Sequence, residues 1–246
     1  MTFQERSNQI LALLREHGSV QSIQLGTLLQ VSPVTIRKDL QRLEEQGELL
    51  RIHGGAALPG PRTPRDPRTD AMEAIAQAAA AQIRDGDCVI LNAGNTTLLT
   101  ARKLMDKEIT LITNSIPIAR ELVASSSVKL IFLGGEINAD AVFTYGWDAL
   151  TQLEQYKANK LILSVSGLSL SAGLTTRHME AADLLRKMVQ RTEIVIAVAD
   201  DTKIGFESFC HVCALDAVDM LLTNATPDTE AQLQTLEQQN IRILRC

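Results

Sequence analysis

Four of the seven prolines in this 246-residue chain stand close together, at positions 59, 61, 64 and 67. Proline lacks a backbone hydrogen-bond donor and fixes φ, so we expect neither a helix nor an inner strand over residues 59–68. We therefore predict two domains, residues 1–58 and 71–246, joined by a linker at residues 59–70. Extended at about 3.1 Å per residue, the linker would span roughly 35 Å, one turn of B-DNA, although its composition suits a flexible tether equally well.

A helix with an exposed basic face is predicted to begin at Pro33. Ser32 can cap the free amides of its first turn, and Pro33 suits the first helical position. Ile36, Leu40 and Leu43 fall on one side at 100° per residue. The other side carries Val34, Thr35, Arg37, Lys38, Gln41 and Arg42. These groups suit a DNA major groove, because Arg and Lys reach guanine or phosphate and Gln reaches adenine; taken alone, the segment also fits a solvated surface helix.

The neighbouring segments favour DNA binding. Apolar stripes predict one helix that ends near His17 and a second from about Gln21 to Gln30. A short connection then leads into the basic helix, which is the order of a helix-turn-helix. Residues 48–58 predict two short strands around a Gly-Gly turn, with Arg51 and His53 near the tip. We therefore predict a winged helix-turn-helix domain.

These motifs resemble the DeoR-type family of bacterial transcriptional regulators. Its recognition helix has the form Ser-Pro-x-Thr-Ile-Arg-x-Asp-Leu, and its wing ends in His-Gly-Gly; residues 32–40 and 53–55 match both patterns. Operator DNA is the partner that the resemblance implies. The predicted DNA contacts are Ser32, Val34, Thr35, Arg37, Lys38, Gln41, Arg42, Arg51 and His53.

The charge distribution, the apolar runs and the cysteines of the chain indicate where it acts and what it can bind. The chain has a net charge of −5, and its acidity lies in residues 71–246, which hold 15 Lys or Arg against 21 Asp or Glu; residues 1–58 are balanced, and residues 59–70 hold three basic and two acidic residues. No run of 18 apolar residues occurs, and we expect a soluble, cytoplasmic protein with no membrane partner. Four cysteines suit a reducing compartment. Cys210 and Cys213 form a lone Cys-x-x-Cys without two further ligands nearby, so we predict no metal and no cofactor.

Residues 71–246 predict an α/β domain with a mainly parallel sheet. Short apolar runs of Val, Ile and Leu alternate with helical stretches, as in a sheet covered on both faces. The expected strands are Cys88–Leu91, Thr110–Thr113, Lys129–Leu133, Lys160–Val165, Glu193–Ala199, Met220–Leu222 and Ile241–Leu244. The expected helices are Ala71–Arg84, Thr97–Met105, Ile116–Ala124, Asp148–Gln155, Glu180–Gln190 and Asp228–Gln239.

Polar residues follow the carboxyl ends of these strands, where open α/β sheets form one crevice. The first such segment, residues 92–97, combines a glycine turn, two hydroxyls and a helix start, which can bind an anion such as phosphate. Ordinary strand-to-helix turns are the alternative for any one segment.

The resemblance to the DeoR-type family extends over this domain. The family's sensor domain resembles ribose-5-phosphate isomerase and typically senses a phosphorylated sugar. Asn92 stands where the family usually has Asp, and Asn95 replaces its first Thr, so the resemblance leaves open which sugar is sensed and whether it must carry a phosphate. The predicted effector-binding residues are Asn92, Gly94, Asn95, Thr96, Thr97, Asn114, Ser115, Gly134, Gly135, Ser166, Gly167, Arg177, His178, Glu180 and Lys203.

The sequence disfavours two other function classes. A sugar-phosphate isomerase needs a general base and an acid at the substrate carbonyl, and the related enzymes carry Asp-Gly-Ala-Asp where this chain has Ser166-Gly167-Leu168-Ser169. A constitutive architectural DNA binder would have no need for converging polar groups in a large second domain. We therefore predict a non-enzymatic transcriptional regulator, a homodimer or homotetramer that represses a carbohydrate-utilisation operon and responds to a sugar phosphate or related sugar.

Overall fold

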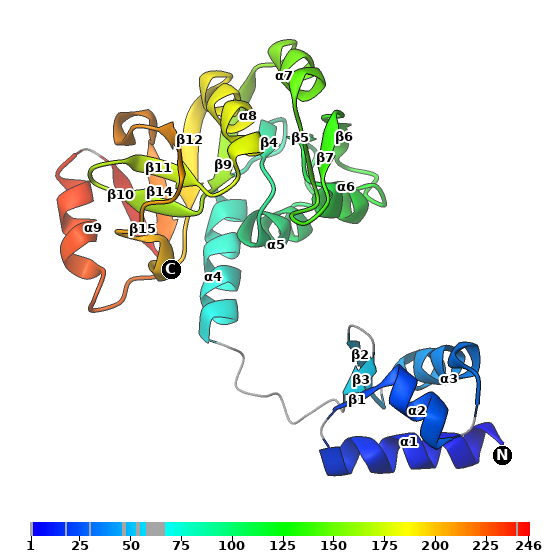
Figure 1. Ribbon diagram of the computed structural model, residues 1–246. Coiled ribbons are helices and arrows are strands. Elements are labelled where there is room, and N and C mark those ends of the chain that lie inside the picture. Colours follow the sequence, from blue (N-terminus) through cyan, green and yellow to red (C-terminus); the bar gives the residue numbers. More distant parts are fainter. Residues whose placement is uncertain are drawn as a thin grey trace. The chain divides into compact units, whose positions relative to one another are not determined.

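A computed structural model describes residues 2–17, 19–29, 31–45, 48–52, 55–57, 67–239 and 241–246. The chain divides into two compact units, Met1–Asp66 and Pro67–Cys246 (Figure 1). Each unit has its own buried apolar cluster. Each is therefore described by itself.

The N-terminal unit packs three helices against a small sheet. The helices are α1 (Phe3–His17), α2 (Ser22–Leu28) and α3 (Pro33–Glu45). Their inner faces supply Ile10, Leu14, Leu25, Ile36 and Leu40, all of them buried. This core confirms the apolar faces predicted for α1 and α3, and the start of α3 at Pro33 agrees with the predicted capping. In the second helical segment Leu25 and Leu29 are buried as predicted, but Leu28, predicted on the same stripe, is 62 % exposed.

The sheet of the N-terminal unit has the order β1-β3-β2, with antiparallel neighbours. Strands β2 (Leu50–Ile52) and β3 (Gly55–Ala57) are the two expected wing strands. Strand β1 (Ser19–Gln21) was not expected, because three residues are too few to show an alternating pattern. The close approach of β1 to β3 requires Gly55, where a Cβ would lie 2.1 Å from the carbonyl oxygen of Val20.

The larger unit begins earlier than the sequence predicted. Helix α4 spans Pro67–Ala81, whereas residues 59–70 were expected to form the linker and residues 59–68 to exclude a helix. Pro67 occupies the first position of the helix, where its missing N–H would have no intrahelical partner in any case. The prediction is therefore wrong for residues 67–70, which are helical.

The main sheet of the larger unit has seven parallel strands in the order β15-β14-β12-β9-β4-β5-β6. The mainly parallel α/β fold that the sequence predicted is thereby confirmed. Every expected strand is present within two residues of its predicted ends. The strands are β4 (Cys88–Leu91), β5 (Thr110–Thr113), β6 (Lys129–Phe132), β9 (Ala158–Ser164), β12 (Thr192–Val198), β14 (Met220–Thr223) and β15 (Arg242–Arg245).

Helices cover both faces of this sheet (Figure 1). One face packs against α4, α5 (Asn95–Lys103) and α6 (Ile116–Leu122). The other packs against α7 (Trp147–Glu154), α8 (Met179–Gln190) and α9 (Glu230–Glu237). The strand order reverses between the neighbouring strands β4 and β9, so the segments that follow them pass to opposite faces of the sheet and leave a crevice at the strand ends, the usual ligand site of open α/β sheets.

Five short strands that the sequence did not predict form two further antiparallel groups in the larger unit. Strands β7 (Glu136–Asn138) and β8 (Phe143–Tyr145) form an antiparallel hairpin. Strands β10 (Gly167–Ser169), β11 (Gly173–Thr176) and β13 (Cys210–Cys213) form a small antiparallel sheet. All have three or four residues, too few for their period to stand out.

Candidate functional site

The recognition helix α3 presents the face that the sequence predicted. The backbone N–H of Thr35 donates to Ser32 Oγ at 3.2 Å, so Ser32 caps the helix. Ile36, Leu40 and Leu43 point into the core. Thr35 is half-buried, and the remaining predicted contacts on this helix are exposed, namely Ser32, Val34, Arg37, Lys38, Gln41 and Arg42.

One polar residue of α3 faces inward and was not predicted to have a role. Asp39 is 5 % exposed and accepts hydrogen bonds from Arg6 of α1, at 2.6 Å from Nε and 3.0 Å from Nη2. This two-point ion pair fixes the rotation of α3 about its axis relative to α1. Arg42 also contacts α1, since its guanidinium lies 4.3 Å from the centre of the Phe3 ring. Asp39 and Arg6 thus position the exposed face.

The wing is described only in part. Arg51 lies on β2, where its backbone pairs with Ala56 of β3. The side chain of Arg51 and the whole of His53 lie outside the described residues, so their predicted DNA contacts stay predictions.

In the larger unit, a cavity of about 550 Å³ opens at the carboxyl ends of β4 and β9. Asn92 follows β4 and joins it to β9: its Nδ2 donates to the carbonyl oxygen of Ser164 and its Oδ1 accepts from the Ser164 N–H, both at 2.8 Å. A carboxylate could accept one of these bonds but could not donate the other. Asn92 therefore joins the ends of β4 and β9 at this side of the cavity without adding a charge there.

The loop after Asn92 leads into the amino terminus of α5. Thr97 Oγ1 donates to the carbonyl oxygens of Asn92 and Gly94, at 2.8 and 3.0 Å, which folds the loop tightly. At Gly94 a Cβ would lie 2.6 Å from Ser164 Oγ, so a larger residue would not fit. Asn95 and Thr96 line the cavity from the first turn of α5, whose positive dipole end favours an anion.

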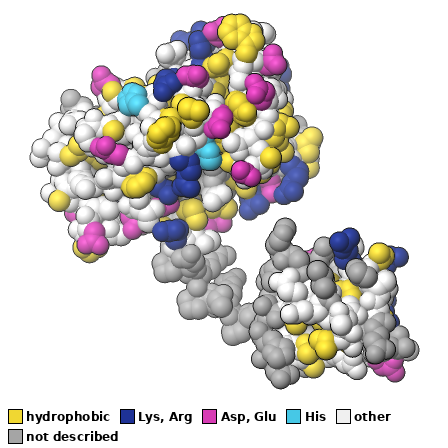
Figure 2. Space-filling view, viewed as in Figure 1, with side chains coloured by type: hydrophobic (Ala, Val, Ile, Leu, Met, Phe, Trp, Pro, Cys, Tyr) yellow, Lys and Arg dark blue, Asp and Glu magenta, His cyan; other side chains and the backbone are white. Residues whose placement is uncertain are grey.

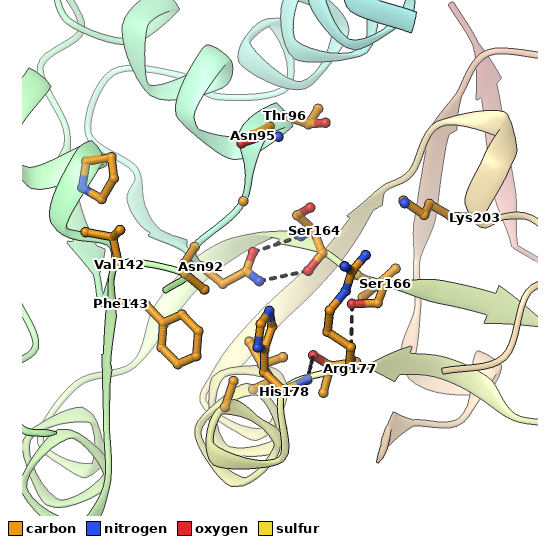
Figure 3. Close-up of a pocket in the computed structure, with 18 of the residues that line it drawn as sticks. Asn92, Asn95, Thr96, Val142, Phe143, Ser164, Ser166, Arg177, His178 and Lys203 are labelled. Atoms are coloured by element: carbon orange, nitrogen blue, oxygen red, sulfur yellow. Dashed lines mark hydrogen bonds between the residues drawn. The ribbon is translucent and has the colours of Figure 1, made fainter. Parts of the chain in front are cut away.

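Cationic side chains meet this helix end from other segments. Arg177 and His178 follow β11, and Lys203 follows β12 (Figure 3). Ser166 Oγ accepts from the Arg177 N–H at 3.1 Å and so holds the loop that carries Arg177. Basic side chains and a histidine lie together near the middle of this face of the larger unit (Figure 2). The cavity can therefore bind an anionic group with both backbone amides and cations.

Nine of the predicted effector-binding residues line the cavity. They are Asn92, Gly94, Asn95, Thr96, Asn114, Ser166, Arg177, His178 and Lys203. The sequence missed further lining residues. These include Arg68 and Met72 of α4, Pro117, residues 140–143 of the β7–β8 hairpin, Ser164, Thr176 and Asp200. Ser164 is the last residue of β9 and the last but one of the predicted strand Lys160–Val165, so its place near a strand end could have indicated it. Arg68 fell in the predicted linker, and the hairpin was not predicted.

Other predicted residues hold the loops instead of lining the cavity. Thr97 folds the loop described above, and Ser115 caps α6 by accepting from the Ile118 N–H at 3.4 Å. At Gly135 and Gly167 a Cβ would come within 2.3 Å of a backbone oxygen, so both glycines permit close packing.

Gly134 and Glu180 also lie apart from the cavity lining. The Gly134 N–H donates to Gln152 Oε1 at 3.0 Å. Glu180 is exposed in the first turn of α8. Burial, then the charge and hydrogen bond of Glu136, and last the charge of Glu180 raise the pKa of Tyr145.

The Cys-x-x-Cys pair lies on β13, away from the cavity. Burial, and then the charge of Asp216, raise the pKa of Cys213 to about 11, so this thiol is neutral near pH 7. Within the described ranges, no cluster of three His, Cys, Asp or Glu side chains could hold a metal ion. Nor does any helix among those residues have the length and apolar character needed to cross a membrane.

Comparison with known families assigns a family to each of the two units. Residues 6–62 match the family described as the DeoR-like helix-turn-helix domain, and residues 68–225 match the DeoR C terminal sensor domain. The chain belongs to the DeoR family of transcriptional regulators. The resemblance predicted from the motifs is thereby confirmed.

Named relatives of this DeoR-family chain are similar over nearly their whole length. The HTH-type transcriptional repressor GlcR of Bacillus subtilis (strain 168) is 34 % identical over 248 residues, which cover 98 % of this chain and 95 % of GlcR. The glycerol-3-phosphate regulon repressor of Escherichia coli (strain K12) is 29 % identical over 98 % of both chains. Among solved structures, ribose 5-phosphate isomerase A from Methanocaldococcus jannaschii has a TM-score of 0.42 at 13 % identity, covering 56 % of this chain and 55 % of that one.

Proposed function

We propose that this DeoR-family regulator represses a carbohydrate-utilisation operon and releases its operator when a sugar phosphate binds the cavity. The observation that carries the proposal is the meeting of the α5 amino terminus with Arg177 and Lys203 in one cavity. A phosphate group suits such a site, since it carries negative charge and several acceptor oxygens. The repressors GlcR and the glycerol-3-phosphate regulon repressor, similar over nearly the full chain, support the assignment.

A buried acceptor supports a hydroxylated ligand. Asn114 lines the cavity and is 2 % exposed. Its Nδ2 donates to the carbonyl oxygen of Thr144 at 2.9 Å, and this bond sets the orientation of the amide. Oδ1 is then the one buried side-chain polar atom in the described part of the chain without a hydrogen-bond partner. A sugar hydroxyl would supply the missing donor.

On the operator side, we propose that α3 enters the major groove. Arg37, Lys38 and Gln41 have the donors and acceptors that read base edges, and the Val34 side chain suits a thymine methyl. Ser32 and Thr35, at the start of the helix, are placed to contact phosphate. Arg51 and His53 of the wing are proposed as further contacts.

Helix α4 offers a path between ligand and linker. It begins at Pro67, and Arg68 and Met72 of its first turns line the cavity. A ligand that contacts this end of α4 would favour one direction of the chain leading to the recognition helix. If that arrangement binds operator less well, the ligand lowers operator affinity by its differential affinity for the two arrangements.

A DNA target implies action in the cytoplasm, and two operator half-sites would suit a homodimer or homotetramer. We propose binding without turnover. If the protein were an isomerase, the general base would have to be one of the two carboxylates that line the cavity, Asp140 or Asp200. Asp200, however, accepts hydrogen bonds from the backbone and hydroxyl of Thr202, which orient it as a cap for the following turn.

The test combines operator release with an assay for turnover. Operator binding is followed by fluorescence anisotropy while glycerol 3-phosphate, ribose 5-phosphate or glucose 6-phosphate is added. We expect release by at least one compound and no aldose–ketose interconversion. Turnover by the wild type that Asp140→Asn or Asp200→Asn abolishes would favour the enzyme, and failure of all three compounds to release DNA would contradict the proposed effector class.

A further inference from the structure

The hairpin of β7 and β8 closes one side of the cavity with a tip of residues 139–142. Asn138 holds this tip: its Oδ1 accepts from the Ala141 N–H at 2.9 Å and its carbonyl oxygen accepts from the Val142 N–H at 2.8 Å. The carbonyl oxygen of Val142 in turn accepts from the Ile116 N–H at the start of α6, at 3.2 Å. The backbone of Val142 is thus fixed on both sides.

Val142 has an unusual backbone conformation. Its φ is +55°, and among the described residues it is the one non-glycine with positive φ. A β-branched side chain is strongly disfavoured in this left-handed region, where Gly or Asn is the ordinary residue. Such a residue persists where the surrounding structure imposes it, and strained residues of this kind gather at ligand sites.

The side chain of Val142 forms part of the cavity wall. Phe143 continues the same wall and packs edge-on against His178, with ring centres 5.4 Å apart. Figure 3 shows Val142 and Phe143 on one side of the cavity and Lys203 on the other. Pro117 adds to the apolar lining. The hairpin side of the cavity therefore has an apolar wall at Val142 and Phe143, beside the carboxylate of Asp140, and the cationic side chain of Lys203 lies at the other end.

We propose that Val142 is a specificity-determining residue of the sensor, whose isopropyl group covers carbon-bound hydrogens of the sugar at the end far from the phosphate. This rests on the proposed function, because the ligand is the effector itself. Glycine would adopt the turn without strain but leave the wall open. Asparagine would tolerate the backbone conformation but place an amide against the sugar. Only a side chain that strains the tip gives an apolar wall here.

Three full-length variants test this proposal. Val142→Gly and Val142→Asn both remove the isopropyl group and relieve the strain. Val123→Gly is the matched control, because Val123 is exposed at the end of α6, has an ordinary φ of −59° and does not line the cavity. Thermal unfolding is measured without ligand. Binding is measured by calorimetry with inorganic phosphate, glycerol 3-phosphate, ribose 5-phosphate and glucose 6-phosphate.

Relief of strain should raise the unfolding midpoint of the larger unit by about 2–4 °C in V142N, and by less in V142G because glycine adds freedom to the unfolded chain. V123G should unfold at a lower temperature than the wild type. Both Val142 variants should bind the organic phosphate preferred by the wild type about tenfold more weakly, since two methyl groups no longer cover it. Affinity for inorganic phosphate, which needs only the cationic end, should be unchanged.

Two results would overturn the proposal: unchanged affinity for the preferred organic phosphate in both Val142 variants, or a lowered midpoint in both. An equal loss of affinity for inorganic phosphate would also contradict it, because the tip would then shape the whole cavity. If the wild type binds none of the organic phosphates, the proposed function fails first and this inference falls with it. The wild-type titration therefore separates the two failures.

Discussion

The two sites of this chain are built in different ways. The proposed DNA-binding face comes from one helix, α3, and its exposed residues follow the 3.6-residue period over residues 32–42. The cavity takes its lining from segments between Arg68 and Lys203, which the parallel sheet brings together. A local pattern therefore determines the first site, whereas strand order and short hairpins determine the second.

The same difference separates the roles of charge. On α3 the acidic Asp39 is turned inward and paired with Arg6, so the outer face keeps its basic character. In the cavity, Lys203 shares the lining with Asp140 and Asp200. The basic side chains Arg37, Lys38 and Arg42 on this face suit the repeated phosphates of DNA, whereas a mixed lining suits a small ligand that carries one phosphate and several hydroxyls.

The largest expected effect tests whether the units unfold separately. Leu40 is 1 % exposed in the core of the N-terminal unit, and Leu40→Ala should lower the stability of that unit by about 2–5 kcal/mol. Leu111→Ala, at a buried position of β5, is the matched change in the larger unit. Differential scanning calorimetry of the full chain should show each substitution shifting a different transition. A shift of both transitions by either substitution would show that the two units are coupled.

The next effect concerns the cationic end of the cavity. Lys203→Ala should leave operator affinity nearly unchanged but raise the effector concentration needed for release by roughly 10- to 150-fold, the worth of one charge-assisted hydrogen bond. Lys157→Ala is the control, because Lys157 precedes β9 at the opposite end of the sheet and pairs with Glu193 on the surface. The measurement is operator release against effector concentration. A normal response of the Lys203 variant would exclude it from the site.

A comparable or smaller effect is expected on the DNA-binding face. Arg37→Ala should weaken operator binding by about 1–3 kcal/mol at one base pair if Arg37 reads a base edge. A phosphate contact would instead lower the salt dependence by about one unit for all sequences. Gel-shift titrations at several salt concentrations distinguish these cases. Sugar-phosphate affinity should not change, and unchanged operator affinity in both Arg37→Ala and Lys38→Ala would contradict the recognition-helix assignment.

The smallest effect separates the two ends of the main sheet. At the amino end, Lys160 Nζ donates to Asp87 at 2.7 Å and so joins β9 to the residue before β4. Burial acts to raise the pKa of Asp87, but hydrogen bonds from Lys160 and the Arg84 backbone outweigh it and hold the pKa below its ordinary value. A depressed folded-state pKa stabilises the fold above the unfolded value of about 3.9, and this contribution is lost as pH falls through the folded value.

Asp87→Asn should therefore cost less than about 1 kcal/mol near neutral pH and weaken the loss of stability below about pH 4. Effector affinity should stay constant, since Asp87 lies away from the cavity lining. Thermal unfolding from pH 3 to 7 checks the first part, and calorimetry with the effector checks the second. If the variant lost stability on acidification as the wild type does, Asp87 would not contribute to the pH dependence of stability.

Periodicity predicted the long elements well, because α3 and the strands of the main sheet have continuous patterns. It failed where structure depends on distant partners. β1 is stabilised by pairing with β3, and the β7–β8 hairpin by contacts such as that of Val142 with Ile116. The prediction misses the first turn of α4 because proline excludes the interior of a helix but not its first position, which Pro67 occupies.

The cavity was predictable only at the strand ends. Asn92, Thr96 and Lys203 follow strands that could be recognised, and the rule for open parallel sheets brings them together. Val142 lines the cavity from a hairpin that was not predicted, and its φ cannot be deduced from the sequence. Gly135 and Gly167 looked like ligand-binding turns but serve close backbone packing, which only coordinates can distinguish.

If the effector releases the operator as proposed, binding at the cavity and binding at the recognition helix are linked through one equilibrium between two arrangements of the protein. The most direct test measures effector affinity by calorimetry with and without saturating operator DNA, beside operator affinity with and without saturating effector. Thermodynamic linkage requires that the two factors be equal, and couplings of this kind typically amount to about 5- to 150-fold. We predict equal factors in the wild type and factors nearer to one in Arg68→Gln, which alters the end of α4 in the cavity. Effector affinity that is the same with and without operator would contradict the account.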